Sequence, residues 1–263
     1  VFAATSPDGR VYRVTLDGQT STVFDPDDTY IWALAVASDG TLYAATGDAA
    51  RIYRITSQDE SEVFFESDAT HVLSRAFEPG GALLAGTESP GQVLRIEQDG
   101  RAFVLLDVPD AEIRSLRVQP DGSVLVVAVN EQGAPVASSA SSTNASSAAT
   151  AAGPTVTVTT SVTAVVADAA TTSTPGASTD GGAGRQGTKG AVYRIASDGL
   201  WDTLWSSDAD VPYDAVFTTA GRLLVGTGPD GKIYQVSDDP PRTVLLGQAP
   251  AQQVMRFLPQ SDG

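Results

Sequence analysis

The stretch TLYAATGDAARIYRI, Thr41 to Ile55, predicts a strand, a tight turn and a second strand, and it recurs along the chain. Similar stretches occupy Val1–Val14, Ala82–Ile96 and Arg222–Val236. A further copy is split, with one strand at Ser123–Val129 and the other at Ala191–Ile195. This repeat predicts the architecture, but it does not by itself predict a biochemical activity.

The spacing of the repeat is measured by an aromatic or leucine residue in its later strand. Tyr12, Tyr53 and Leu94 follow one another at 41 residues, as do Tyr193 and Tyr234, whereas Leu94 and Tyr193 are 99 apart. A period of about 40 residues with four short strands per unit is typical of propeller blades. The sequence therefore predicts an all-β propeller of about five four-stranded blades.

The expected blades cover residues 30–70, 71–111, 112–210 and 211–251, and a further blade is shared between 1–29 and 252–263. The first segment lacks a first strand, which Gln253–Leu258 would supply. Pairing of the two ends would close a five-bladed ring and cover apolar faces that are otherwise left in water. The alternative is an arc of a larger propeller, and the sequence leaves both open. Since Val1 lies inside a repeat, we expect a fragment of a longer protein.

Residues 133–187 differ in composition from the rest of the chain. They are mainly Ala, Ser, Thr, Gly and Val, and their charged residues are Asp168, Asp180 and Arg185. Such a segment buries too little apolar area to offset the entropy lost on ordering. We expect a flexible low-complexity insertion within the 112–210 blade, acting as a lid, a tether or passive filler.

Charge and composition exclude several classes of function. The formal net charge is −16, which disfavours nucleic acid as a partner. The chain has no cysteine, so thiolate catalysis and disulfides are excluded. No apolar run reaches the roughly 18 residues that span a bilayer. The sequence does not determine the compartment; we favour a periplasmic or extracellular one, and no signal segment is visible in this chain.

The pattern Gly-x-Leu-Tyr-Ala-Ala-Thr-Gly followed by Ile-Tyr-Arg-Ile resembles bacterial propeller repeats. It is similar to the NHL and two-component-regulator propeller types and to secreted WD40-like proteins of soil bacteria. The resemblance covers the whole chain except the insertion, and it implies a fold rather than an activity.

An enzymatic group of propellers, the gluconolactonases and strictosidine synthases, offers an alternative. The resemblance to its lactonase members would imply a divalent metal held by Glu, Asn and Asp in the central channel. The asparagines of this chain are Asn130 and Asn144, and the latter lies in the insertion, so that ligand set cannot be carried over.

Acidic residues gather in the expected loops at one end of the blades. In a propeller, the loops that lead into first strands share a face with the loops between second and third strands. These acids are Asp25, Asp27, Asp28, Asp68, Asp110, Glu112, Asp208 and Asp210 in the former loops, and Asp8, Asp48, Glu88 and Asp230 in the latter. We therefore expect an acidic face that attracts a cation or a basic protein. No cofactor is evident. The candidate ligands of a divalent cation are Asp27, Asp68, Asp110 and Asp208, although the sequence lacks the spacing of a dedicated calcium loop.

Residues that break the repeat cluster in the expected first strands, nearest the channel. Arg75 and Arg256 stand where other blades have leucine, Arg117 is a further charged departure, and Asp214 stands where they have alanine or serine. A charge in such a place needs a partner, either a ligand or another residue, for example Asp214 with Arg75 or Arg256. The candidate ligand-binding residues are Trp32, His71, Arg75, Arg114, Tyr213 and Asp214.

These observations favour a non-enzymatic binding, sensing or scaffold module that contacts a protein or a small ligand at its acidic face. We assign no catalytic residues, and the solitary His71 cannot form a histidine metal cage. The alternatives are a channel-centred, metal-dependent hydrolase or lyase, and a structural segment of a larger envelope protein.

Overall fold

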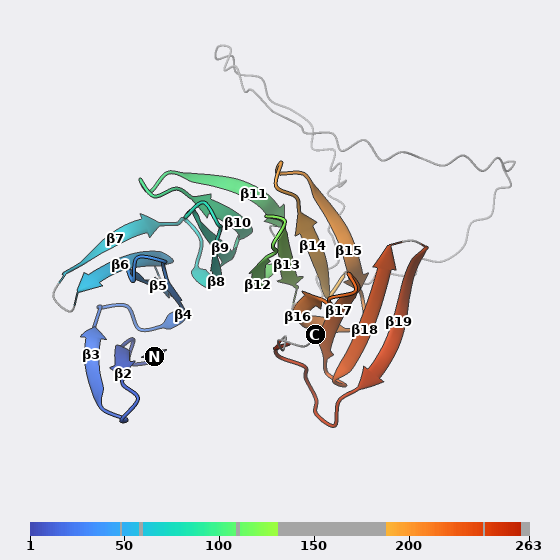
Figure 1. Cartoon of the computed structure of the whole chain (residues 1–263), viewed down its shortest axis with the longest axis horizontal. Helices are drawn as coiled ribbons and strands as arrows, with labels where there is room; N and C mark the ends of the chain where they lie inside the picture. Colours follow the sequence, from blue (N-terminus) through green and yellow to red (C-terminus); the bar gives the residue numbers. More distant parts are fainter. Residues whose placement is uncertain (48, 58–59, 109–110, 131–187, 239, 259–263) are drawn as a thin grey trace, which may run out of the picture. The chain divides into compact units, whose positions relative to one another are not determined.

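The computed structural model describes residues 1–47, 49–57, 60–108, 111–130, 188–238 and 240–258, which belong to one unit made of Val1–Pro135 and Gln186–Gly263. Within these residues every regular element is a β-strand (Figure 1), so the all-β prediction is confirmed. No helix in the described part is long and apolar enough to cross a membrane. The predicted insertion, residues 133–187, lies outside the described residues.

The strands form a short sheet followed by four antiparallel, four-stranded ones. The first sheet contains β1 (Phe2–Ala4), β2 (Val11–Val14) and β3 (Thr20–Phe24). The others contain β4 (Ile31–Val36), β5 (Leu42–Thr46), β6 (Arg51–Ser57) and β7 (Glu60–Glu66); β8 (His71–Phe77), β9 (Leu83–Glu88), β10 (Gly91–Ile96) and β11 (Ala102–Val108); β12 (Glu112–Val118), β13 (Val124–Val129), β14 (Gly190–Ile195) and β15 (Trp201–Ser207); and β16 (Val211–Phe217), β17 (Leu223–Gly228), β18 (Lys232–Asp238) and β19 (Pro241–Gln248). A single pairing of Glu112 with Glu88 joins two of these sheets along the edge.

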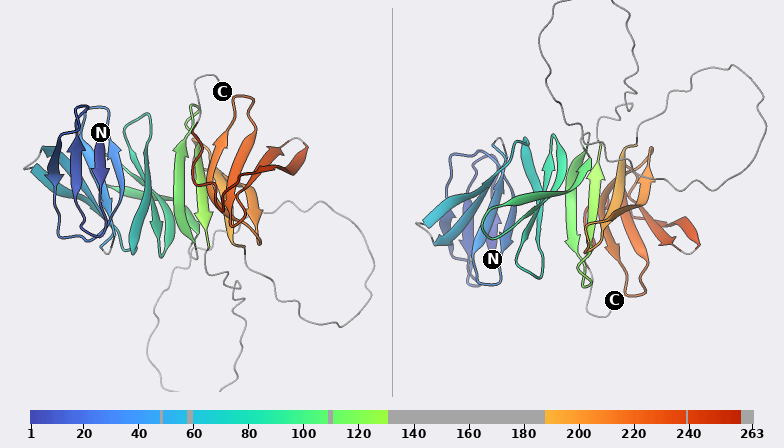
Figure 2. Two further views of the ribbon diagram at one scale, coloured as in Figure 1. Left: turned by 90° about the horizontal axis from the view of Figure 1, so that it is seen from below. Right: turned by 90° about the horizontal axis from the view of Figure 1, so that it is seen from above.

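Each sheet presents its first strand to the inside and its last strand to the outside (Figure 1). The first strands β1, β4, β8, β12 and β16 contact one another in chain order, and the turned views show the sheets side by side (Figure 2). Four buried apolar clusters in the described part fill the spaces between consecutive sheets. For example, Ile52 of β6 packs with Val72 of β8 and Leu83 of β9. Stability thus comes from apolar burial between the faces of neighbouring sheets.

The small residues of each second strand allow this close approach. A Cβ added to Gly86 would lie 2.2 Å from Ser74 Oγ and 2.5 Å from Ile113 Cγ2, so no larger side chain fits between β8 and β12. The threonine that follows is fully buried in three sheets, and its hydroxyl binds a backbone carbonyl of the next hairpin. Thr46 donates to Arg51 O at 3.2 Å and Thr227 to Lys232 O at 3.0 Å. The recurrent threonine therefore fastens the turn between the second and third strands.

Two acids of the expected acidic face, Asp28 and Asp210, are buried. Asp28 accepts a hydrogen bond from Tyr53 Oη at 2.6 Å, and Asp210 accepts one from Tyr234 Oη at 2.7 Å. A cation two residues before each tyrosine completes the group: Arg51 lies 3.7 Å from Asp28, and Lys232 lies 2.8 Å from Asp210. These aspartates tie the loop that enters each sheet to its third strand.

The sheet β8–β11 lacks this hydrogen bond between aspartate and tyrosine, which we call the tyrosine anchor. In the sheet β8–β11 the tyrosine is replaced by Leu94 and the aspartate by Ala69, and both are buried within one apolar cluster. An apolar pair replaces a hydrogen-bonded pair, which leaves no polar group without a partner. The equivalent aspartate of the next sheet, Asp110, lies outside the described residues, as does Asp48.

The repeated arginines of the third strands form framework ion pairs within their own sheets. Arg54 pairs with Glu62, Arg95 Nε with Glu78 at 2.6 Å, and Arg194 Nη2 with Asp121 at 2.7 Å. These pairs give the repeated arginines a structural role within each sheet.

The prediction of a strand at Gln253–Leu258 is wrong, because these residues have no strand assignment. Gly231 N donates to Gln252 O at 2.8 Å, and Val254 N donates to Thr227 O at 3.2 Å. Their backbone is therefore engaged by the last sheet, and no hydrogen bond among the described residues joins them to β1. The choice between a closed ring and an arc stays a prediction.

Candidate functional site

A β-bulge at the same repeat position aims one side chain of each first strand. The register of β4 with β5 skips Trp32, that of β8 with β9 skips Leu73, that of β12 with β13 skips Arg114, and that of β16 with β17 skips Tyr213. A bulged residue is unpaired in the ladder and its side chain is re-aimed, a device often found beside binding sites. Three of the four bulged residues are among the six candidates from the sequence.

The bulged residues Trp32, Arg114 and Tyr213 take part in three ring contacts. Trp32 stacks on Tyr30 with centroids 5.4 Å apart and meets His71, the first residue of β8, edge-on at 5.7 Å. The guanidinium of Arg114 lies 4.8 Å from the ring centroid of Tyr213 and forms an ion pair with Glu112. Gln253 Nε2 also donates to Tyr213 Oη at 2.8 Å. Four candidates thus occupy the ends of consecutive first strands.

A pocket of about 360 Å³ lies against these first strands. Its walls are residues 32–34 of β4, 73–75 of β8 and 114–116 of β12, together with Ala4, Ile31 and Arg256. The same three repeat positions therefore supply three walls. We call this space the hub pocket. Trp32, Arg75 and Arg114 of the six candidates line it.

Asp214 is buried beside the pocket and is held by internal donors. Its carboxylate accepts hydrogen bonds from Ser115 Oγ at 3.2 Å, from Arg117 Nε at 3.3 Å and Nη2 at 2.6 Å, and from Phe257 N at 2.7 Å. Four donors match the four lone-pair positions of a carboxylate. The main partner of Asp214 is therefore Arg117, whereas Arg256 Nε lies 4.0 Å away. The expected pair of Asp214 with Arg75 does not occur among the described residues.

Arg75 has an unusual environment. Its Nε is buried and has no hydrogen-bond partner within the part of the chain that the structure describes. Burial lowers the pKa of the Arg75 guanidinium, and the nearby charge of Arg256 lowers it further. The side chain is thus desolvated and repelled by a like charge, which is costly unless something else compensates it.

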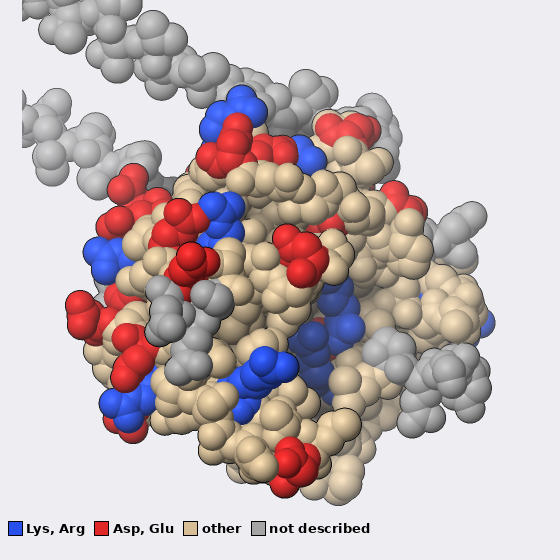
Figure 3. All heavy atoms as spheres, turned by 60° about the vertical axis from the view of Figure 1, so that its left-hand side comes forward, with Lys and Arg blue, Asp and Glu red and all other residues tan. Residues whose placement is uncertain are grey.

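The electrostatics of the hub pocket oppose those of the surrounding surface. Figure 3 shows Lys and Arg side chains in the hollow of one face, with Asp and Glu mostly around it.

The candidate metal ligands Asp27, Asp68 and Asp208 are exposed, and Asp110 lies outside the described residues. In the described part no group of three His, Asp or Glu residues could hold a metal ion.

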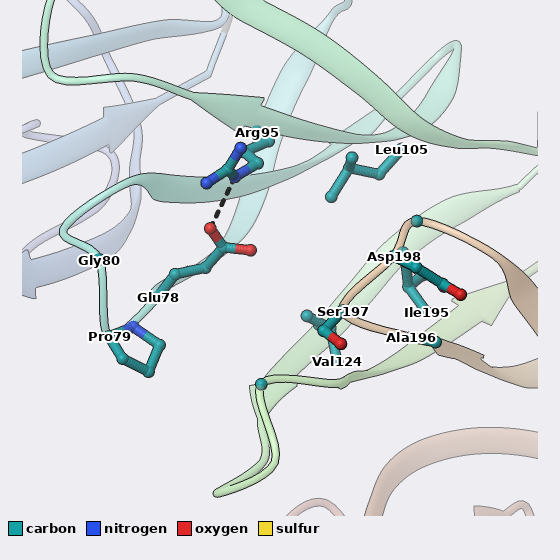
Figure 4. A pocket seen from close by; sticks show the side chains of 12 residues that line it. Glu78, Pro79, Gly80, Arg95, Leu105, Val124, Ile195, Ala196, Ser197 and Asp198 are labelled. Atoms are coloured by element: carbon teal, nitrogen blue, oxygen red, sulfur yellow. Dashed lines mark hydrogen bonds and ion pairs between the residues drawn. The ribbon is translucent and has the colours of Figure 1, made fainter.

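A second cavity, of about 370 Å³, lies between the sheets β8–β11 and β12–β15 (Figure 4). Glu78 and Arg95 face each other on one side of it, and residues 196–199 border it on the other. Arg95 is satisfied by Glu78 at 2.6 Å and by Glu97 at 2.9 Å. Since this arginine belongs to the repeated framework, we assign no ligand to the cavity.

The candidates from the sequence omit three residues that matter here. Leu73 lines the hub pocket, and its position 41 residues after Trp32 and 41 before Arg114 would have identified it. Arg117 and Arg256 break the repeat, but the sequence does not reveal which arginine reaches Asp214. The four possibilities are Arg75, Arg114, Arg117 and Arg256.

The sheets and their hub define a protein of the β-propeller class, and the solved structures that the chain resembles belong to this class. Virginiamycin B lyase from Staphylococcus aureus with quinupristin is 12% identical, with a TM-score of 0.56 over 95% of this chain and 69% of that one. The nidogen–laminin complex gives 12% identity and a TM-score of 0.55 over 95% of this chain and 78% of that one. A putative gluconolactonase is 13% identical, with a TM-score of 0.50 over 96% of this chain and 71% of that one.

These likenesses establish the fold alone, because sequence identity is low and propellers serve many activities. No protein-family model matches the sequence. No curated protein matches it either. The particular repeat type expected from the sequence stays a prediction.

Proposed function

We propose that this chain is a non-enzymatic binding or sensing propeller that holds a small ligand in the hub pocket. The observation that carries the proposal is the placement of departures from the repeat. Arg75 stands where other first strands have leucine or alanine, and Trp32 and Arg114 occupy the bulge position, which holds a different residue in each of the four sheets. All three line one space. The framework does not need these side chains, because the other blades fold with different residues at the same positions.

The dimensions and chemistry of the pocket support a small ligand. Its volume of about 360 Å³ falls at the lower end of the range of small-molecule sites, about 300–1,000 Å³. Trp32 is 45% exposed and supplies an aromatic surface, while the guanidinium groups supply directed donors. The bulges fix these side chains on strands rather than on loops, which limits the entropy lost on binding.

The proposal is tested by a ligand-observed NMR screen of a small-molecule library against three variants. Trp32→Ala removes the aromatic surface, and Leu73→Trp fills the pocket. Trp201→Ala is the matched control, because Trp201 is also a half-exposed tryptophan, 49% exposed, on the outer strand β15. We expect hits that are lost in both hub variants and retained in the control. Hits that survive in both hub variants would place binding elsewhere and refute the proposal.

The alternative of a metal-dependent hydrolase or lyase requires a further measurement. Elemental analysis of the purified protein and a turnover assay on the confirmed hits separate the two functions. A stoichiometric divalent ion together with turnover of a bound hit would replace binding with catalysis as the function.

A further inference from the structure

We infer, resting on the proposed function, that the ligand of the hub pocket is a small oxyanion, a carboxylate or a phosphate, held between Arg75 and Arg256. Both arginines line the pocket, one from β8 and the other from the segment after β19. An oxyanion is the chemical group that two guanidinium groups recognise through paired hydrogen bonds.

The first argument is the state of Arg75. Its Nε is buried without a hydrogen-bond partner among the described residues, although a guanidinium normally satisfies its donors when desolvated. Neighbouring serines do not compensate, because they donate elsewhere: Ser74 Oγ to Ile113 O at 2.8 Å and Ser115 Oγ to Asp214 at 3.2 Å. An acceptor that enters the pocket would satisfy this donor.

The second argument is that the internal acid is already saturated. Asp214 receives four hydrogen bonds, from Ser115, Arg117 and Phe257. Arg256 therefore makes only a long ion pair with it, Nε to Oδ2 at 4.0 Å, and the Arg256 side chain is 57% exposed. Arg256 and Arg75 are close enough to repel each other, and one bound anion would relieve that repulsion for both.

The acidic surroundings do not contradict this assignment. The chain carries a net charge of −16, so its long-range field repels large polyanions. The guanidinium groups of the pocket attract a small anion at short range, where the field of the more distant acids is screened. Arg114, the other arginine of the pocket, is engaged by Glu112 and Tyr213. The two remaining arginines are thus the ones that determine ligand charge.

Isothermal titration with citrate and, separately, with inorganic phosphate tests the inference and distinguishes the two oxyanion classes. The titrations are done at constant ionic strength, set with sodium chloride. We expect one of the two anions to bind, and binding to weaken at least tenfold in Arg75→Met and in Arg256→Gln. The control Arg101→Gln has the same change of charge at a 72% exposed surface position and retains the native affinity.

A thermal measurement guards against variants that merely misfold. Arg75→Met removes a buried, repelled charge, so in chloride its unfolding midpoint should be equal to or higher than that of the native protein. A lower midpoint in chloride, anion binding that is unchanged in Arg75→Met and Arg256→Gln, or no binding of either anion to the native protein would each overturn the oxyanion assignment.

The outcome also separates this inference from the broader proposal. If a neutral or cationic compound binds and requires Trp32, the pocket is a ligand site but not an oxyanion site. If citrate or phosphate still binds when Leu73→Trp fills the pocket, the anion lies elsewhere and the inference fails.

Discussion

Asp214 Oδ2 of β16 and Arg117 Nη2 of β12 lie 2.6 Å apart and connect two neighbouring sheets across 97 positions of sequence. The same Nη2 donates to Phe257 O at 2.8 Å, so the pair also holds the C-terminal segment against the hub. Asp214 is completely buried and the Arg117 side chain is 18% exposed. This ion pair therefore lies next to the hub pocket, because Asp214 also contacts Ser115 and Arg256, which line it.

Replacing Asp214 by leucine should strongly destabilise the protein. Loss of one partner from a buried ion pair leaves the other charge uncompensated, which costs about 3–5 kcal/mol. Chemical denaturation should show a lower midpoint with a similar slope. A double variant, Asp214→Leu with Arg117→Met, should recover most of that loss; failure to recover would show that the pair acts through more than its charges.

Replacing Gly86 by alanine should destabilise the contact between the sheets β8–β11 and β12–β15. The added methyl would approach Ser74 and Ile113 to less than 3 Å, and overpacking of this kind costs about 1–3 kcal/mol. The control is Gly247→Ala in the outer strand β19, where nothing lies within 4 Å of the new methyl. Equal unfolding midpoints for the two variants would contradict the close packing.

Replacing Gly47 by alanine should displace the aromatic part of the hub. The new Cβ would lie 2.5 Å from Trp32 Nε1 and 2.8 Å from His71 Nδ1, so both rings must move. We expect a changed tryptophan emission spectrum and weaker binding of hub ligands, whereas Gly80→Ala, in open space, should change neither. An unaltered spectrum in Gly47→Ala would show that the rings are not held as described.

Stability should fall in alkaline solution through the tyrosine anchors. Burial raises the pKa of Tyr53 and of Tyr234 above the ordinary value of 10.0, and the hydrogen bond to the aspartate adds to the effect. A raised pKa keeps the folded tyrosine protonated while the unfolded one ionises. The contribution is therefore complete below pH 10 and is lost as the pH rises beyond it.

Thermal unfolding between about pH 8 and about pH 11 measures this dependence. The double variant Tyr53→Phe with Tyr234→Phe should be less stable at neutral pH, because Asp28 and Asp210 lose a donor, yet its midpoint should fall less steeply with pH. An equally steep fall would assign the alkaline transition to other groups.

The strands were predictable from the sequence because their signals are local. Period-two alternation, turn glycines and the recurring threonine depend on residues a few positions apart, and the 41-residue spacing of Tyr12 and Tyr53 repeats them. The prediction of a strand at Gln253–Leu258 was wrong because a strand-like sequence pattern does not guarantee a neighbouring strand to pair with. Its backbone groups are bound by Thr227, Asp214 and Arg117 instead.

The candidate site was predictable in part for the same reason. Departures from a repeat can be seen without coordinates, and they identified Trp32, Arg75 and Arg114, which line one pocket. The repeat could not show that Asp28 is buried under Tyr53, or that Arg117 rather than Arg75 reaches Asp214.

The sequence by itself determined that this protein is built of repeated four-stranded antiparallel sheets, because the hydrogen bonds of each sheet join segments that are adjacent along the chain. Only the tertiary structure decided the charge of the hub, because it depends on which side chains from different sheets come within hydrogen-bonding distance. The bulges at Trp32, Leu73, Arg114 and Tyr213 re-aim these side chains, and a difference of one residue in register separates a wall of the pocket from a packed face.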